Sequence, residues 1–315
     1  MMRQPQIGWL KDGQRLHLQD GPIDLIVQAQ GSRANLRAAY AAAIDRFTGL
    51  LDELCDELPL LRAAADPYAC ILQGAVARRM HAAVVPFARD HFITPMAAVA
   101  GSVAEEILGS MTQAAPIDRA YVNNGGDIAL HLTEGEAFTV GLIDRPDMFG
   151  LMRTTVIRES DPTRGIATSG WHGRSFSLGI ADAVTVMAKT AARADAAATI
   201  IANAVDLPGH PAIIRCPANE LQPDSDLESH LVTRQVGVLT PFEVATALQA
   251  GDTKARQLLG CGLIEAAALH LKGEIRAVGL PSRDADVLRQ SSPAAAVRLP
   301  ERTSPPASVQ EGAHP

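Results

Sequence analysis

The chain has 315 residues, of which 47% are apolar and 20% charged, so it is long and apolar enough to build a sizeable hydrophobic core. Its net charge of −7, isoelectric point near 5.7 and lack of a Lys/Arg cluster argue against a nucleic-acid-binding surface. No apolar run reaches the roughly 18 residues needed to span a bilayer, and the N-terminal segment lacks the apolar core of a secretion signal. We therefore expect a cytoplasmic protein without membrane segments.

The cysteines do not indicate a metal or disulfide framework. None of the four lies in a C-x-x-C spacing, and one is inside a helical pattern. Small apolar thiols are commonly buried in cores. We therefore expect buried free thiols at Cys55, Cys70, Cys216 and Cys261.

The N-terminal part begins with two short runs of alternating apolar and polar residues, which predict strands. A long helix follows, because apolar residues recur at every third or fourth position after a cap at Ser32 or Asn35. Two further helices are predicted, the second just after Pro95. In chain order these elements are expected over residues 15–19, 24–28, 36–58, 73–85 and 96–111.

The second half mixes strands with helices. Strands are predicted over residues 120–123, 128–132, 137–143, 154–158 and 179–187, and helices over residues 191–204, 242–250 and 254–271. From about residue 281 onward Pro, Ser, Ala, Arg and Glu dominate, which predicts a disordered tail over 281–315. We therefore predict an α+β fold, a layered antiparallel sheet with covering helices, in a single large domain over residues 1–280.

The first candidate ligand motif is N-N-G-G-D-I, which begins at Asn123. Gly125 and Gly126 allow positive φ and close approach of a ligand to backbone N–H groups, and Asp127 adds a carboxylate. N-G and G-G are also strong hairpin signals between two strands. Considered by itself, the spacing favours the hairpin.

The second motif is I-A-T-S-G-W-H-G-R, which begins at Ile166. Its small residues, two hydroxyls and glycines predict a loop that donates hydrogen bonds to phosphate oxygens. The motif lacks the G-K-[ST] of a Walker loop, and Ala167 occupies the first glycine of G-x-S-x-G, which weakens a serine-hydrolase interpretation. His172 and Arg174 offer a base and an anion partner, or belong to an exposed turn.

The third motif is A-D-A-A-A-T, on the helix predicted over residues 191–204. Asp195 and Thr199 are four residues apart, so their oxygens point the same way. A carboxylate and a hydroxyl form a plausible incomplete shell for Mg²⁺, which takes further oxygens from water and phosphates. Taken alone, an Asp in a first helical turn, stabilised by the helix dipole, is the favoured interpretation.

In their order and spacing, N-x-G-G-D-I, A-T-S-G and A-D-A-x-x-T resemble the motif series of the FAD:protein FMN transferases, the ApbE family. Residues 97–106 are similar to that family's G-G-I-A-K-G-Y-A-V-D helix. The whole chain is more similar to a less-understood branch of the family, through residues 93–101, 121–128 and the S-D-L at 225–227. The resemblance implies an ApbE-like, T-fold-like architecture.

The resemblance also implies a ligand site. The family holds its metal through the Asp and Thr of A-D-A-x-x-T and a main-chain oxygen, which correspond here to Asp195, Thr199 and Ala100. The implied cofactors are Mg²⁺ and FAD or FMN, and the implied partners are a phosphorylated small molecule and a protein acceptor. The flavin-nucleotide pocket is implied to be lined by Asn124, Gly125, Gly126, Asp127, Thr168, Ser169 and Gly170.

Three departures from the family pattern affect charged groups. Trp171 follows S-G where the transferases have an acid, and Gly101 stands in place of a lysine. The H-I-x-D-P-x-T-G segment is missing, and residues 175–182 read S-F-S-L-G-I-A-D instead. Loss of these groups removes charges that would stabilise a diphosphate during cleavage. The departures indicate a changed activity, or binding without transfer.

Three functional hypotheses follow. The first is a flavin- and Mg²⁺-binding ApbE-like protein, including a divergent FMN transferase. The second is an accessory subunit of a redox system such as anaerobic sulfur assimilation. The third is a repurposed small-molecule hydrolase or lyase that uses His172, Arg174 or Asp182. The Ala-rich helices are compatible with a homodimer, and equally with close packing inside one chain.

Overall fold

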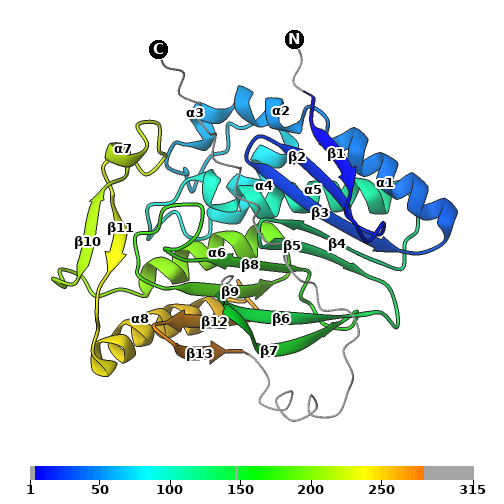
Figure 1. Cartoon of the computed structure of the whole chain (residues 1–315). Helices are drawn as coiled ribbons and strands as arrows, with labels where there is room; N and C mark the ends of the chain where they lie inside the picture. Colours follow the sequence, from blue (N-terminus) through cyan, green and yellow to red (C-terminus); the bar gives the residue numbers. More distant parts are fainter. Residues whose placement is uncertain (1–3, 146–147, 280–315) are drawn as a thin grey trace, which may run out of the picture.

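The computed structural model describes residues 4–145 and 148–279. A nine-stranded sheet forms its centre, and every neighbouring pair of strands is antiparallel (Figure 1). Its strands, in spatial order, are β1 (Gln6–Trp9), β2 (Leu16–Asp20), β3 (Ile23–Gln30), β4 (Arg119–Asn124), β5 (Asp127–Leu132), β8 (Gly165–Ser169), β9 (Ala183–Ala188), β12 (Ala266–Leu271) and β13 (Glu274–Val278).

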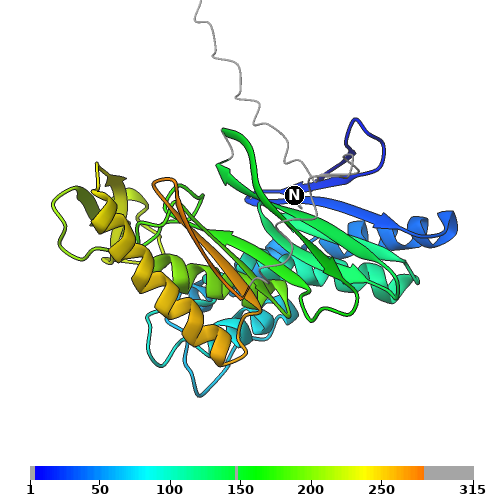
Figure 2. The ribbon, with the colours of Figure 1, turned by 90° about the horizontal axis from the view of Figure 1, so that it is seen from below.

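Helices cover one face of this sheet (Figure 2). Helix α5 packs on β4 and β5, α6 on β8 and β9, and α8 on β12 and β13, while α1 lies against α5. The apolar face of the sheet and the inner faces of these helices form the main core. The main helices are α1 (Arg33–Phe47), α4 (Ala75–Val84), α5 (Val99–Ala114), α6 (Ala191–Ala204) and α8 (Pro241–Gly260); shorter ones are α2 (Leu50–Asp56), α3 (Leu58–Leu61), the 3₁₀ turn η1 (Pro95–Ala98) and α7 (Ala218–Leu221).

The opposite face of the sheet carries a second, smaller apolar cluster beneath the hairpin of β6 (Ala137–Arg145) and β7 (Met148–Arg158). Phe138 of this hairpin meets Tyr121 edge-on at a centroid distance of 6.0 Å, and Leu130 and Ile166 belong to the same cluster. Another two-stranded sheet, β10 (Ile213–Pro217) with β11 (Leu231–Val236), stands apart. The predicted α+β class with a layered antiparallel sheet is therefore confirmed.

The long N-terminal helix was predicted wrongly as one element. Gly49 has a φ of 84°, a left-handed conformation that breaks the helix after Phe47. Three shorter helices result, and Pro59 lies in the first turn of the third, α3. Ser32, one of the two predicted caps, accepts a hydrogen bond from the Asn35 backbone N–H.

Several strands differ from prediction. The strand expected over residues 179–187 begins only at Ala183, and the helix expected over 254–271 ends at Gly260 and is followed by β12. The first four residues of the predicted phosphate loop, 166–169, belong instead to strand β8, which pairs with β5 and β9. No strand was predicted at the positions of β1, β10, β11 and β13.

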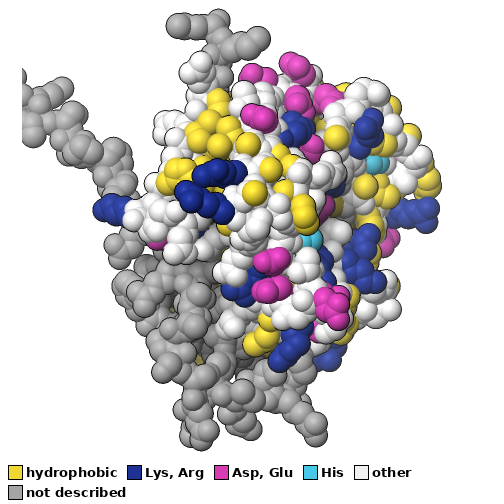
Figure 3. Space-filling view, turned by 90° about the vertical axis from the view of Figure 1, so that its right-hand side faces the viewer, with side chains coloured by type: hydrophobic (Ala, Val, Ile, Leu, Met, Phe, Trp, Pro, Cys, Tyr) yellow, Lys and Arg dark blue, Asp and Glu magenta, His cyan; other side chains and the backbone are white. Residues whose placement is uncertain are grey.

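The cysteines are free, as predicted, but the expectation that they are buried was wrong. Cys55, Cys70 and Cys261 are exposed and Cys216 is half-buried. The predicted tail over 281–315 lies outside the described residues. Within the described ranges, no helix is long and apolar enough to cross a membrane. Figure 3 shows basic and acidic side chains interspersed over the face at the β1–α1 end of the molecule.

Candidate functional site

The first motif forms the turn of the β4–β5 hairpin. Asn124 and Asp127 are paired across the strands, so Gly125 and Gly126 are the two turn residues, with φ of 66° and 119°. Positive φ at both positions strongly favours glycine. The Asn123 Oδ1 atom accepts a hydrogen bond of 2.8 Å from the Gly126 N–H. The hairpin that the spacing favours is confirmed, and it places Asp127 at the start of β5.

Asp127 faces the helix layer. Side chains alternate along β5, and Ala129, two residues on, belongs to the main core under the helices. The Asp127 Oδ1 atom accepts a hydrogen bond of 3.3 Å from the backbone N–H of Thr168, near the end of β8. The turn of one hairpin and the end of a neighbouring strand thus meet at this carboxylate.

Asp195 lies opposite, on α6. Its Oδ2 atom accepts a hydrogen bond of 3.0 Å from the Gly101 N–H, in the first turn of α5. It is the fifth residue of α6, so the first-turn interpretation of this Asp was wrong. The carboxylate is therefore held between two helices and the sheet.

The two carboxylates interact electrostatically. Burial raises the pKa of Asp127 to about 7, and the Thr168 hydrogen bond and the Arg174 charge only partly oppose this. Burial, and then the Asp127 charge, raise the pKa of Asp195 well above its usual range, against hydrogen bonds from Gly101 and Ala100. An acidic pair of this kind binds a proton or a cation more readily than isolated carboxylates do.

The predicted main-chain ligand, the Ala100 carbonyl, is close by. Its oxygen accepts a hydrogen bond of 3.2 Å from the Asn124 Nδ2 atom, and a carbonyl oxygen has a second lone pair left. Asn124 is buried, and its amide links the β4–β5 turn to α5 rather than projecting into solvent. Thr199 is half-buried one helical turn beyond Asp195.

The T-S-G segment contributes less side-chain chemistry than predicted. Ile166 belongs to the cluster on the far face of the sheet, so by alternation the Thr168 side chain faces away from Asp127; its hydroxyl lies 2.9 Å from that of Thr185. Only the Thr168 backbone N–H reaches Asp127. At Gly170 an added Cβ would lie 2.4 Å from the Asp182 carbonyl oxygen, so this glycine permits a close backbone contact.

One of the departures from the family pattern has a visible geometric consequence. At Gly101 an added Cβ would lie 2.3 Å from the carbonyl oxygen of Ala191, so no side chain fits where the family has lysine. The Arg174 guanidinium lies against Gly125, and its charge acts on Asp127. A basic group near the acidic pair therefore comes from a different segment of the chain.

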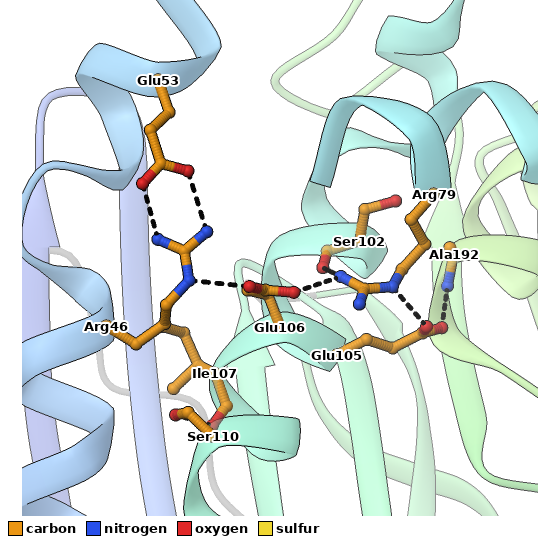
Figure 4. Close-up of polar contacts among 9 residues, drawn as sticks. All are labelled: Arg46, Glu53, Arg79, Ser102, Glu105, Glu106, Ile107, Ser110 and Ala192. Atoms are coloured by element: carbon orange, nitrogen blue, oxygen red, sulfur yellow. Dashed lines mark hydrogen bonds and ion pairs between the residues drawn. The ribbon is translucent and has the colours of Figure 1, made fainter. Parts of the chain in front are cut away.

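A chain of ion pairs fixes the helix that carries Asp195 (Figure 4). The Glu105 carboxylate of α5 accepts a hydrogen bond of 2.7 Å from the Ala192 N–H in the first turn of α6. Arg79 of α4 contacts Glu105 at 3.4 Å and Glu106 at 2.9 Å. Arg46 of α1 continues the chain from Glu106, at 2.7 Å, to Glu53 of α2. We did not predict this network, because its members come from five helices and share no local spacing.

We expect Glu106→Gln to lower the free energy of unfolding by about 1–3 kcal/mol at pH 7, because it leaves two half-buried guanidinium groups with one carboxylate less. Burial tends to raise the pKa of Glu106, but hydrogen bonds from Arg46 and Arg79 outweigh it and hold the pKa below its usual 4.5. The carboxylate therefore stabilises the fold above the unfolded-state pKa, and this contribution is lost as pH falls through the lower folded-state pKa.

Urea unfolding between pH 3 and pH 7 measures this effect. Glu53→Gln is the matched control. The Glu53 side chain is 51% exposed at the end of the same network, so this substitution should lower the free energy of unfolding by less than about 0.5 kcal/mol. Equal losses in the two variants, or a Glu106→Gln loss that does not shrink in acid, would contradict the assignment.

Within the described ranges, no group of three or more His, Cys, Asp or Glu side chains is arranged to hold a metal. A shallow depression of about 490 Å³ is lined by residues of α8 and by Arg276 of β13, and it contains none of the predicted site residues. The predicted metal ligands differ from such a group, because they combine side-chain carboxylate and hydroxyl with a backbone carbonyl.

Comparisons with known proteins show the family of the chain. The model of a bacterial family described as AbpE bacteria matches residues 7–277, so the chain belongs to the ApbE family. It is 34% identical over 181 residues to a UPF0280 protein of Methanothrix thermoacetophila, covering 55% of this chain and 71% of that protein.

Other similar proteins carry the same description. A UPF0280 protein of Methanococcoides burtonii is 35% identical over 170 residues, covering 51% of this chain and 65% of the relative. Among solved structures, the crystal structure of the ApbE protein of Thermotoga maritima covers 84% of this chain and 96% of its own, with a TM-score of 0.42 and 14% identity.

Proposed function

We propose that this protein binds a flavin nucleotide, or a related phosphorylated ligand, together with Mg²⁺ where the β4–β5 turn, the end of β8 and helices α5 and α6 meet. The observation that carries the proposal is the convergence of Asp127 and Asp195: burial raises the pKa of both carboxyl groups, and repulsion by the Asp127 charge raises the pKa of Asp195 further. A divalent cation relieves such repulsion, and Mg²⁺ prefers oxygen ligands.

The residues present fit a Mg²⁺ ion. Asp195, Thr199 and the Ala100 carbonyl supply the oxygens, with water and ligand phosphates completing the shell. When bound, the ion supplies positive charge that neutralises phosphate oxygens. Gly101 and Asn124 hold two of these oxygens in place through the hydrogen bonds described above.

Protein groups around the acidic pair suit a phosphorylated ligand. The Gly125–Gly126 turn has no Cβ atoms to hinder approach, and the half-exposed Gly126 keeps its backbone open on one side. Arg174 adds a guanidinium at the same turn, a group that binds phosphate well. The proposal has three more specific parts. The protein transfers FMN to a protein hydroxyl, it has a protein acceptor, and it is located in the cytoplasm.

Titration of the purified full-length chain with FAD, with and without Mg²⁺, tests the proposal by isothermal calorimetry. We expect one ligand per chain and binding that depends on Mg²⁺. Mass spectrometry of the protein as purified should show a co-purifying phosphorylated compound. Failure of FAD, FMN and ADP to bind in the presence of Mg²⁺, or equal binding of each in its absence, would rule the proposal out.

A further inference from the structure

Asp182 is a buried carboxylate that the site described above does not use. Its side chain is 1% exposed, and backbone and side-chain donors surround it. The Trp171 indole Nε1–H donates to Oδ1 at 3.2 Å, and the Lys272 backbone N–H donates to Oδ2 at 2.6 Å. The carboxylate thus lies in a fixed position between β9 and the β12–β13 turn.

His172 is the exposed partner of this buried carboxylate. Its Nε2 atom lies 3.3 Å from the Asp182 Oδ1 atom, while its side chain remains 51% exposed. The Trp171 ring lies against the imidazole at a centroid distance of 3.8 Å. The nearby carboxylate favours the tautomer that carries its proton on Nε2, and in that tautomer the Nδ1 atom is a proton acceptor.

His270, the other histidine near Asp182, is not equivalent. It is 5% exposed, and its Nε2 atom accepts a hydrogen bond of 3.1 Å from the Gly273 N–H. Its Nδ1 atom lies 3.8 Å from the Asp182 Oδ2 atom. His270 therefore lies behind the carboxylate, and His172 is the one that meets solvent.

The turn that carries His172 starts directly beyond the proposed ligand site. The Gly173 N–H donates to the Gly170 carbonyl at 3.0 Å, which closes a turn with Trp171 and His172 at its tip. Thr168, just before this turn, bonds to Asp127, and Arg174, just after it, reaches Gly125. The turn is thus anchored to the acidic pair on both sides.

This geometry places a buried acid beside the turn after the T-S-G segment. The Trp171 indole donates to the carboxylate of Asp182, at the end of the segment 175–182. The same carboxylate lies beside His172, the residue that follows Trp171.

We propose that His172, oriented by Asp182, is the proton acceptor for a hydroxyl nucleophile that attacks a phosphorylated ligand at the Asp127–Asp195 site; this rests on the proposed function. The hydroxyl oxygen forms a bond to phosphorus as the bond from phosphorus to the leaving phosphate oxygen breaks. The leaving group takes that bonding pair, and the hydroxyl proton passes to the His172 Nδ1 atom. Asp182 remains a carboxylate and stabilises the imidazolium.

Chemical footprinting tests the placement without relying on turnover. Diethyl pyrocarbonate modifies accessible imidazole, and mass spectrometry reports the rate at each histidine. We expect saturating FAD with Mg²⁺ to slow modification of His172 at least about 5-fold. His210, which pairs with Glu243 at 2.9 Å on another part of the surface, should react at an unchanged rate. An unchanged rate at His172 while calorimetry shows FAD bound would overturn the placement.

Turnover tests the role. Release of AMP from FAD should fall at least about 100-fold in His172→Gln, a loss typical of a missing general base, while the affinity for FAD with Mg²⁺ stays within about 2-fold. His210→Gln, which breaks a comparable histidine–carboxylate pair, should retain the wild-type rate. Assays in buffer alone and with a threonine-containing peptide distinguish water from a protein hydroxyl as the nucleophile.

The outcomes separate this inference from the proposed function. If FAD does not bind with Mg²⁺, the proposed function fails and His172 loses its role with it. If FAD binds but wild type releases no AMP with either nucleophile, or His172→Gln matches wild type, the site stands and the role of His172 is wrong. Asp182→Asn should reproduce the loss in rate if it folds, because it weakens the orientation of the ring.

Discussion

Asp195→Asn should weaken Mg²⁺-dependent binding of FAD at least about 100-fold and, at the same time, stabilise the ligand-free protein at pH 8. Mutation of groups that only orient metal ligands typically lowers metal affinity about 10–100-fold, so loss of a direct ligand should lower it at least about 100-fold. The stabilising effect follows because the variant removes one of two carboxylates that repel each other.

The pH dependence follows from the direction of the pKa shifts. Asp127 has a pKa of about 7 in the folded chain against an ordinary 3.8, so between these values the folded state binds more protons than the unfolded state. The free energy of unfolding therefore falls as pH rises through this window, by at most about 1.4 kcal/mol per pH unit for each such proton. In urea unfolding at pH 5, 7 and 8, the free energy of unfolding should fall less steeply with rising pH for Asp195→Asn than for wild type.

Asp252→Asn is the matched control for this variant. Asp252 is a buried carboxylate on α8 that pairs with Arg256 at 2.7 Å, and it belongs to no predicted site. It should keep wild-type binding of FAD with Mg²⁺. Wild-type binding by Asp195→Asn, or an equal loss in Asp252→Asn, would show that Asp195 is not a ligand of the ion.

Gly101→Ala should lower the free energy of unfolding by about 3 kcal/mol or more, the upper range for forcing atoms into a packed contact. The added Cβ would lie 2.3 Å from the Ala191 carbonyl oxygen and 2.7 Å from the Ala192 nitrogen, and both are backbone atoms at the start of α6. Neither can rotate away, so α5 and α6 must separate. Asp195 would then move from the Gly101 N–H, and Mg²⁺-dependent binding should weaken as well.

Gly109→Ala is the control on the same helix. Nothing lies within 4 Å of an added Cβ at Gly109, so the substitution should stabilise the protein by about 0.5–1 kcal/mol through helix propensity. Denaturant unfolding measures both variants. If Gly101→Ala is tolerated as well as Gly109→Ala, the α5–α6 contact is not as close as described.

Short-range sequence patterns correctly predicted those elements whose conformation depends on residues close to them in the sequence. The N-N-G-G turn specified its hairpin, and the alanine-rich helix over 191–204 was predicted with the bounds of α6. Strand β12 was missed because A-A-A-L-H-L continues an apolar run without a change of period, and its pairing with β9 decides its conformation. Strand β8 was missed because glycine and hydroxyl residues favour loops unless tertiary pairing overrides them.

The candidate site was predictable only in part, for the same reason. Motif resemblance selected Asp127 and Asp195, but no spacing indicates that they face each other across the sheet and helix layers. The side on which the Thr168 hydroxyl lies depends on the start of β8, which was not predicted. The contact of Trp171 with Asp182 joins two ends of an irregular segment. The sequence therefore shows that position 171 lacks an acid, but it does not show that the Asp182 carboxylate lies beside it.

The most direct test of the Asp127–Asp195 site is the thermal unfolding of the ligand-free protein with and without Mg²⁺ at pH 6 and pH 8. Metal binding requires deprotonated carboxylates, and the pKa of Asp127 is about 7. Millimolar Mg²⁺ should therefore raise the Tm of wild type clearly more at pH 8 than at pH 6, should leave the Tm of Asp195→Asn nearly unchanged, and should raise the Tm of Asp127→Asn less than that of wild type. A wild-type Tm that does not respond at pH 8, or an equal rise in all three proteins, would contradict a metal site at this acidic pair.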